Sequence, residues 1–182
     1  MSGIDAHVLY ALYAIRDPFL TQLFLLITEF GEARVILFLT IGLAVYLFMR
    51  RRAAELLGIL MTVGGAGVVV YALKEIVARE RPEAIYNAVA ETTSSFPSWH
   101  AGLALAFYGY CIYLLWPYTR AHRSAGVAIG LLNVLIVLVV FSRLYLGVHY
   151  VSDVLVGALI GAVFLAAGIF VSGRFKRPQA AS

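Results

Sequence analysis

The sequence is poor in charged residues, and this scarcity excludes most water-soluble folds. Only 13% of its 182 residues are Asp, Glu, Lys or Arg, whereas 62% are hydrophobic and the mean hydropathy is +0.90. Soluble domains average about 25% charged and about 45–50% apolar residues. The composition therefore predicts an integral membrane protein, and the length fits a single domain over residues 1–182.

Cysteine is nearly absent as well, since Cys111 is the only one. A disulfide within the chain is therefore excluded, and the cysteine content does not indicate the redox compartment. The first residues lack the basic segment that opens a secretory signal peptide, and Arg16-Asp17-Pro18 interrupts the first apolar stretch. The sequence thus predicts no cleaved signal peptide.

What the chain has in abundance is long apolar runs, and a membrane-spanning helix needs roughly 20 apolar residues. Residues 4–30 hold two shorter apolar pieces, which predict helices in the membrane interface, with a sixth, kinked span as the alternative. The fold class expected is all-α, an integral membrane bundle of five to six transmembrane helices. The five clear spans are expected at about 33–49, 54–73, 100–117, 125–141 and 150–172.

Glycines recur four residues apart within two of these runs, at Gly126/Gly130 and at Gly157/Gly161. Small residues at this spacing let neighbouring transmembrane helices approach closely. Both pairs are therefore predicted to be helix-packing contacts.

Basic residues predict how the bundle is oriented. Three basic clusters, at 50–52, 120–123 and 173–177, fall on one face when the helices alternate in direction, and the positive-inside rule makes that face cytoplasmic. The net charge of +4 then mostly reflects topology. The opposite, extracytoplasmic surface receives three polar segments, 74–83, 96–100 and 142–153.

Each polar residue in these segments also has a structural interpretation. Lys74 could reach the interface from a helix end, and Arg79 and Arg81 could be ordinary loop charges. His100 could bond the backbone at a helix start. Polar groups at membrane depth are nevertheless costly and usually functional, so their convergence on one end of the bundle favours a site.

The residue types in these segments indicate an anion site. Lys74, Arg81 and Arg143 could neutralise a phosphate, and arginine adds a fork of donors. In "FPSWH", Ser98 is predicted to cap a helix whose first turn holds Trp99 and His100. The free N–H groups of such a helix start attract anions.

Two histidines could supply the chemistry. His149 and Asp153 are spaced i,i+4, which places them on one helix face. A carboxylate that accepts the Nδ1–H of a histidine leaves Nε2 free as a nucleophile or base. His100 would then be a second proton carrier from another helix.

These motifs resemble those of a known family. "KEIVARERP" fits Lys, six residues, Arg-Pro; "PSWH" is similar to Pro-Ser-Gly-His; "SRLYLGVHYVSD" fits Ser-Arg, five residues, His, three residues, Asp. Their order and spacing resemble the type 2 phosphatidic acid phosphatase (PAP2) superfamily. The motifs span residues 74–153, and Trp99 departs from the family pattern, which has glycine there.

The resemblance implies a role for each matching residue. His149 would attack phosphorus and form a phosphohistidine, Asp153 would orient it, and His100 would protonate the leaving oxygen and then activate water. The resemblance implies no metal, cofactor or nucleic acid. The phosphate oxygens would be held by Lys74, Arg81, Ser98 and Arg143, with the backbone N–H of Trp99 able to contribute.

The function expected is a metal-independent lipid phosphate or diphosphate phosphatase in a bacterial inner membrane, with its active site on the periplasmic face. Undecaprenyl diphosphate is the substrate we favour. Phosphatidic acid, phosphatidylglycerophosphate and lipid A remain open, as does a phosphotransferase activity. The alternative of another class is a non-catalytic protein that binds or carries a lipid anion, and the oligomeric state is left open.

Overall fold

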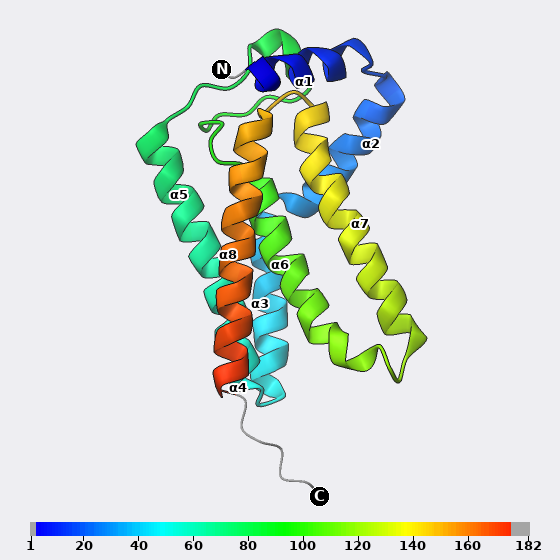
Figure 1. The fold of residues 1–182 in the computed structure, drawn as a ribbon, viewed down its shortest axis with the longest axis vertical. Coiled ribbons are helices and arrows are strands. Elements are labelled where there is room, and N and C mark those ends of the chain that lie inside the picture. Colours follow the sequence, from blue (N-terminus) through cyan, green and yellow to red (C-terminus); the bar gives the residue numbers. More distant parts are fainter. Residues whose placement is uncertain (1–2, 176–182) are drawn as a thin grey trace, which may run out of the picture.

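The computed structural model describes residues 3–175, which form helices and loops without a β-strand in that range. Figure 1 shows a bundle of long, roughly antiparallel helices with one short helix lying across its end. The elements are α1 (Gly3–Ala14), α2 (Pro18–Thr28), η1 (Glu29–Gly31), α3 (Ala33–Met49), α4 (Ala53–Ile59), η2 (Leu60–Gly64, a π-helical turn), α5 (Gly65–Val77), η3 (Ala84–Tyr86), α6 (Trp99–Leu115), η4 (Trp116–Tyr118), α7 (Arg123–Tyr145) and α8 (Val151–Phe175).

The prediction of a helical membrane bundle is confirmed. Among residues 3–175, four helical runs are long and apolar enough to cross a membrane. The expected span 33–49 does not pass this test by itself, because α3 has only 17 residues. It passes only together with 18–31, as a pair bent by 44°, which allows a fifth span. The four single runs are Ala53–Val77, Trp99–Tyr118, Arg123–Tyr145 and Val151–Phe175.

The N-terminal segment forms two helices joined by a sharp corner. Asp17 caps α2, because its Oδ1 accepts the backbone N–H groups of Phe19 and Leu20, and Pro18 occupies the first helical position. Helix α1 lies across the end of the bundle, above the starts of α6 and α8 (Figure 1). Its place in the membrane interface remains a prediction.

Helix α6 forms the centre of the bundle and packs most closely against α8. A Cβ atom added at Gly161 would lie 2.4 Å from the carbonyl oxygen of Gly102, and one at Gly157 would lie 2.5 Å from that of Ser98. The predicted packing role of Gly157 and Gly161 is therefore confirmed. The same prediction for Gly126 and Gly130 is wrong, because a Cβ at either would meet open space.

Helix α7 diverges from the bundle at the end far from α1 (Figure 1). Its apolar side chains Val127, Leu131, Val134 and Val137 are more than half exposed. In a membrane-spanning helix, such residues face lipid, so the outward face of α7 needs no further protein partner.

Candidate active site

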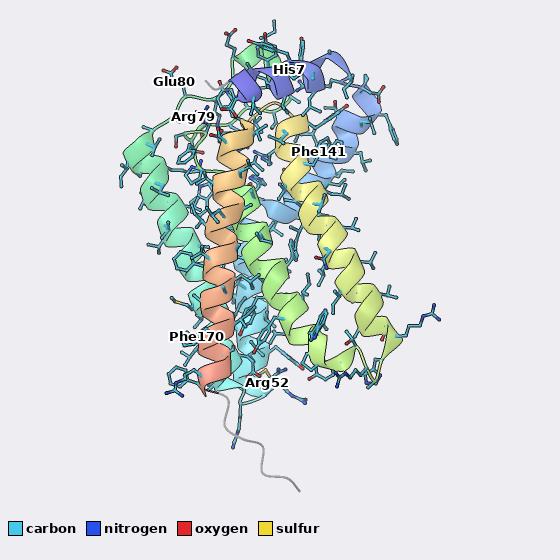
Figure 2. All side chains as sticks on the ribbon, viewed as in Figure 1. His7, Arg52, Arg79, Glu80, Phe141 and Phe170 are labelled. Atoms are coloured by element: carbon cyan, nitrogen blue, oxygen red, sulfur yellow. The ribbon has the colours of Figure 1, made fainter. Side chains whose placement is uncertain are left out.

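Three segments that are far apart in the sequence meet at the end of the bundle where α1 lies. Lys74 is in the last turn of α5, "FPSWH" leads into α6, and His149 lies in the short loop between α7 and α8. Figure 2 labels Arg79 at this end and Arg52 at the opposite end. The predicted convergence of 74–83, 96–100 and 142–153 is therefore present in the structure.

His149 and Asp153 face each other at the start of α8. Nδ1 of His149 lies 3.5 Å from Oδ2 of Asp153, which is longer than an ordinary hydrogen bond. The backbone N–H of Tyr150 donates to the same carboxylate oxygen at 2.9 Å. Both side chains are buried, at 3% and 0% exposure. The His149–Asp153 pair is therefore buried, and a small movement of either side chain would bring Nδ1 and Oδ2 within hydrogen-bond distance.

The environment keeps His149 neutral. Burial is the main reason that its pKa lies far below the usual value, at about 3. Asp153 raises this pKa, whereas the charges of Arg143 and Arg81 lower it. An uncharged imidazole with its proton on Nδ1 keeps a free lone pair on Nε2. The Nε2 atom lies 3.4 Å from Nη1 of Arg81, so it faces a predicted anion-binding cation.

The three predicted cations are held by the protein itself. The Nε and Nη1 atoms of Arg81 donate to the carbonyl oxygens of Thr93 and Val148 at 2.7 and 2.8 Å. Arg143, which is 1% exposed, donates to Oγ1 of Thr28 at 2.8 Å. Lys74 is 4% exposed and contacts the carbonyl oxygen of Ser94.

A carboxylate that the sequence analysis did not single out joins two of these cations. One oxygen of Glu91 pairs with Nη2 of Arg143, and the other lies 3.5 Å from Nη2 of Arg81. Burial alone would raise the pKa of Glu91, but Arg143 and Arg81 lower it below its usual value. A negative charge therefore lies between the two arginines.

"FPSWH" forms the predicted helix start. Ser98 is the N-cap of α6, and its Oγ accepts the N–H of Ala101 at 3.5 Å. Its own N–H donates to the carbonyl oxygen of Asp153 at 3.0 Å, which ties the starts of α6 and α8 together. His100 is 6% exposed, and its Nε2 lies 3.4 Å from Glu32. This second histidine therefore has a carboxylate partner from the start of α3.

Trp99 is half-buried at the first position of α6. Its ring approaches Gly67 of α5, where an added Cβ would lie 3.9 Å from Cζ3 of the indole. The side chain therefore lies between α5 and α6, while its backbone remains in the helix start.

A second polar network lies behind the Asp153 carboxylate. Nη1 of Arg79 donates to Oδ1 of Asp153 at 2.6 Å and to Oγ of Ser152 at 2.7 Å. Nη2 of Arg79 pairs with Asp5 of α1 at 3.0 Å. Arg79, which could have been an ordinary loop charge, therefore contacts a predicted catalytic residue.

Sequence reasoning missed Glu91, Glu32 and Asp5, and weak signals for them exist. Glu91 is the only charged residue between positions 84 and 98, and Asp5 is an acidic residue beside an apolar stretch. Isolated charges next to apolar segments often have partners. Their partners, however, lie 52 and 147 positions away in the sequence for Glu91 and Asp5.

The described residues 3–175 contain no group of three or more His, Cys, Asp or Glu side chains placed to hold a metal ion. That the reaction needs no metal stays a prediction. The residues that the sequence analysis proposed for phosphate binding are basic or neutral donors, which suits an anion rather than a cation.

The apolar helical bundle, with two buried histidines at one end, defines a class, the helical membrane proteins with a polar site at one end of the bundle. Comparison with known families identifies the class more closely. The model of the PAP2 superfamily matches residues 55–177. The chain belongs to this superfamily, and it is an enzyme, a membrane-embedded lipid phosphatase.

Two comparisons with Bacillus subtilis, one of sequence and one of structure, support this assignment. Phosphatidylglycerophosphatase B of strain 168 is 33% identical over 164 residues, which cover 88% of this chain and 79% of the relative. The crystal structure of a transmembrane PAP2 type phosphatidylglycerolphosphate phosphatase has a TM-score of 0.84 and 30% identity, covering 96% of this chain and 87% of the other.

The crystal structure of Aquifex aeolicus LpxE is a more distant neighbour. It has a TM-score of 0.73 at 21% identity, with 93% of this chain and 96% of that chain covered. This likeness shows the shared helical fold.

Proposed function

We propose that the protein hydrolyses the phosphate monoester of a membrane phospholipid, with phosphatidylglycerophosphate as its substrate, through a phosphohistidine on His149. The observation that carries the proposal is the direction of the His149 ring. Its Nδ1 faces Asp153, and its Nε2 faces Arg81 at 3.4 Å. With the proton on Nδ1, the Nε2 lone pair faces the N–H of Arg81, so a phosphate bound by that arginine would lie next to Nε2.

The substrate follows from the relatives rather than from the geometry. In both comparisons with Bacillus subtilis, the matching protein is named for activity on phosphatidylglycerophosphate, and the match has 30% identity or more over most of this chain. Undecaprenyl diphosphate, which the sequence analysis favoured, has no comparable support. It belongs in the test panel together with phosphatidic acid and lipid A.

The reaction would proceed in two steps. Nε2 of His149 attacks phosphorus as the bond from phosphorus to the lipid oxygen breaks, and His100 gives that oxygen a proton. A water molecule then attacks the phosphohistidine, giving its proton to His100, and inorganic phosphate leaves. Capture of the phosphohistidine by a lipid hydroxyl instead of water would make a phosphotransferase.

The remaining polar groups would stabilise the charge that develops on the phosphate oxygens. Arg81 and Arg143 present guanidinium donors, Lys74 adds a point charge, and the start of α6 offers Ser98 and free N–H groups. The contacts of Arg81 and Arg143 with Thr93, Val148 and Thr28 would hold these donors in place, whereas Glu91 would have to share them with phosphate or move.

A panel of lipid substrates tests the activity. Purified protein in detergent should release phosphate from phosphatidylglycerophosphate faster than from undecaprenyl diphosphate, phosphatidic acid or lipid A, and excess chelator should leave the rate unchanged. A higher kcat/KM for another panel member would replace the proposed substrate. Activity that is lost with chelator and restored by a divalent metal would overturn the metal-free reaction.

Two variants test the nucleophile. His149→Ala should abolish turnover, whereas Asp153→Asn should leave a measurable rate, lower by about 10⁴-fold if the carboxylate acts as in a triad. Labelled substrate, quenched in alkali, should leave label on the parent and on Asp153→Asn but not on His149→Ala. Equal residual rates in the two variants, or label on His149→Ala, would exclude His149 as the attacking group.

A further inference from the structure

We propose that Asp5 of α1 is a positioning residue of the active site, which holds Arg79 and Ser152 so that the Asp153 carboxylate faces His149. The inference rests on the proposed roles of His149 and Asp153. It goes beyond them because the sequence motifs for this chemistry begin at Lys74, whereas Asp5 lies in the first helix.

Asp5 is almost completely buried, at 3% exposure, although α1 lies at the end of the bundle. Its Oδ1 accepts the backbone N–H of Ser152 at 3.0 Å, and its Oδ2 accepts the Ser152 hydroxyl at 2.8 Å and Nη2 of Arg79 at 3.0 Å. A carboxylate with three such donors is fixed in position and direction.

Arg79 links Asp5 to the carboxylate of Asp153, because it donates to both. Its Nη1 donates to Oδ1 of Asp153 at 2.6 Å, and its guanidinium carbon lies 4.3 Å from the centre of the Tyr150 ring. The opposite oxygen of Asp153 faces His149 and accepts the N–H of Tyr150. Rotation of this carboxylate away from His149 would break the contact with Arg79, so Arg79 determines where the second oxygen points.

Asp5 also acts on the backbone that carries His149. Ser152 is in the first turn of α8, where backbone N–H groups have no partner within the helix. The Asp5 carboxylate satisfies one of these groups, and a negative charge at a helix start is favourable. His149 lies three residues before Ser152, so this contact fixes the turn that presents the imidazole.

The charged side chains of this network partly neutralise one another. Arg79 is the cation that contacts both buried carboxylates, Asp5 and Asp153. Removing one member of such a group leaves another with an unpaired charge in a buried place. The hydrogen bonds of Asp5 and Arg79 given above reach Ser152 and the Asp153 carboxylate, so we expect the network to act first on the nucleophile.

The simpler interpretation is that Asp5 merely anchors α1. The structure offers a control for it, because α1 has a second anchor in which Tyr10 and Tyr13 pack on Tyr86 with ring centres 5.4 and 5.1 Å apart. This anchor does not include the residues that contact Asp153. Weakening it tests the docking of α1 without changing the proposed positioning contacts.

Steady-state kinetics on a short-chain soluble phosphate ester, measured well below the melting temperature, separate the two interpretations. Asp5→Asn should lower kcat by roughly 10- to 100-fold, the scale of a small misplacement of a catalytic group, with KM unchanged. Asp5→Glu, which keeps the charge, should recover part of the rate. Tyr13→Leu should lower the melting temperature and leave kcat as in the parent.

A double-mutant cycle provides a measurement that an anchoring role would not affect. If Asp5 acts through Asp153, then Asp5→Asn should lower kcat in the parent but have almost no further effect in an Asp153→Asn background. An equal fall in both backgrounds, or an equal fall in Tyr13→Leu, would overturn the inference. These outcomes differ from failure of the proposed function, in which the parent would release no phosphate or Asp153→Asn would match the parent.

Discussion

At the scale of single residues, Glu91 places a carboxylate where the substrate phosphate is proposed to bind. Its two oxygens contact Arg143 and Arg81, and its side chain is 24% exposed. Substrate or product phosphate would have to share these arginines with Glu91 or displace it. We therefore expect the carboxylate to lower the affinity of the site for phosphate and to favour release of the product.

Neutralising Glu91 should tighten the binding of product. In Glu91→Gln, the inhibition constant of inorganic phosphate should fall roughly fivefold, since a charge interaction of about 1 kcal/mol is removed. Because the pKa of Glu91 lies below its usual value, the parent should keep its weaker binding at neutral pH and approach the variant only as acid protonates Glu91. Glu83→Gln, at an exposed site, is the matched control. An unchanged or higher constant would mean that Glu91 orders the arginines instead of competing.

Trp99 combines two functions at one position, since its backbone belongs to the helix start and its indole lies between α5 and α6. We expect Trp99→Gly to keep phosphatase activity, because either residue supplies the N–H. The fall in kcat/KM should be larger for a long-chain lipid than for a short-chain analogue, since tryptophan favours the interface. Thermal stability is measured alongside. Equal losses for both substrates in a stable variant would assign Trp99 to the chemistry.

At the scale of elements, the crossing of α6 and α8 sets the site, because it joins the two helix starts that carry Ser98 and Asp153. The N–H of Ser98 bonds to the Asp153 carbonyl, and Gly102, Gly157 and Gly161 let the two backbones approach closely. A change in the distance between these helices would separate the histidine pair from the donors of α6.

Gly161→Ala should therefore destabilise the protein. Its new methyl group would lie 2.4 Å from a backbone oxygen of Gly102, so the helices must move apart, at a cost of roughly 1–3 kcal/mol. Gly130→Ala is the matched control, since its methyl group would meet open space and alanine is the better helix former. The melting temperature in detergent should fall for the first variant and hold or rise for the second. The same fall in both would argue against a packing role for Gly161.

At the scale of the whole molecule, the two ends of the bundle differ: one carries basic clusters and the other carries the candidate active site. The basic clusters 50–52 and 120–123 lie at the end opposite to α1 and the site, as Figures 1 and 2 show. Of the third cluster, 173–177, residues 176 and 177 lie outside the described residues. The positive-inside rule would place the site outside the cytoplasm.

Cysteine labelling tests this orientation. In a background with Cys111→Ser, a cysteine replacing the exposed Ala84 should react with a membrane-impermeant thiol reagent in intact cells. A cysteine replacing the exposed Ala121, at the opposite end, should react only after lysis. The reverse pattern would invert the topology and place the active site in the cytoplasm.

Hydropathy predicted the helices of the bundle well because lipid exposure requires apolar residues along the whole length of a span. The expected run 54–73 corresponds to Ala53–Val77, and 125–141 to Arg123–Tyr145. The glycine spacing was less informative. Gly126/Gly130 and Gly157/Gly161 have the same pattern, and only the second pair faces a neighbouring helix. The spacing of glycines along one helix does not indicate which face of that helix packs against a neighbour.

The site was predictable where its residues follow each other closely. The pairing of His149 with Asp153 and the capping role of Ser98 were predicted from local spacing. The shared helix face predicted for the pair is wrong, because His149 lies in the loop before α8. The contacts of Glu91 and Asp5 could not be inferred, because each depends on how separate helices are placed in space. Arg79 was ambiguous for the same reason.

The bond from Asp5 to Ser152 joins residues 147 positions apart. During synthesis α1 leaves the ribosome long before α8. Asp5 therefore has no Ser152 to bind while the intervening helices enter the bilayer. A nascent chain that ends within α7 lacks both His149 and the backbone that Asp5 holds. The proposed catalytic arrangement is therefore complete only once α8 has docked against α1, and chains that lack this helix are expected to be inactive.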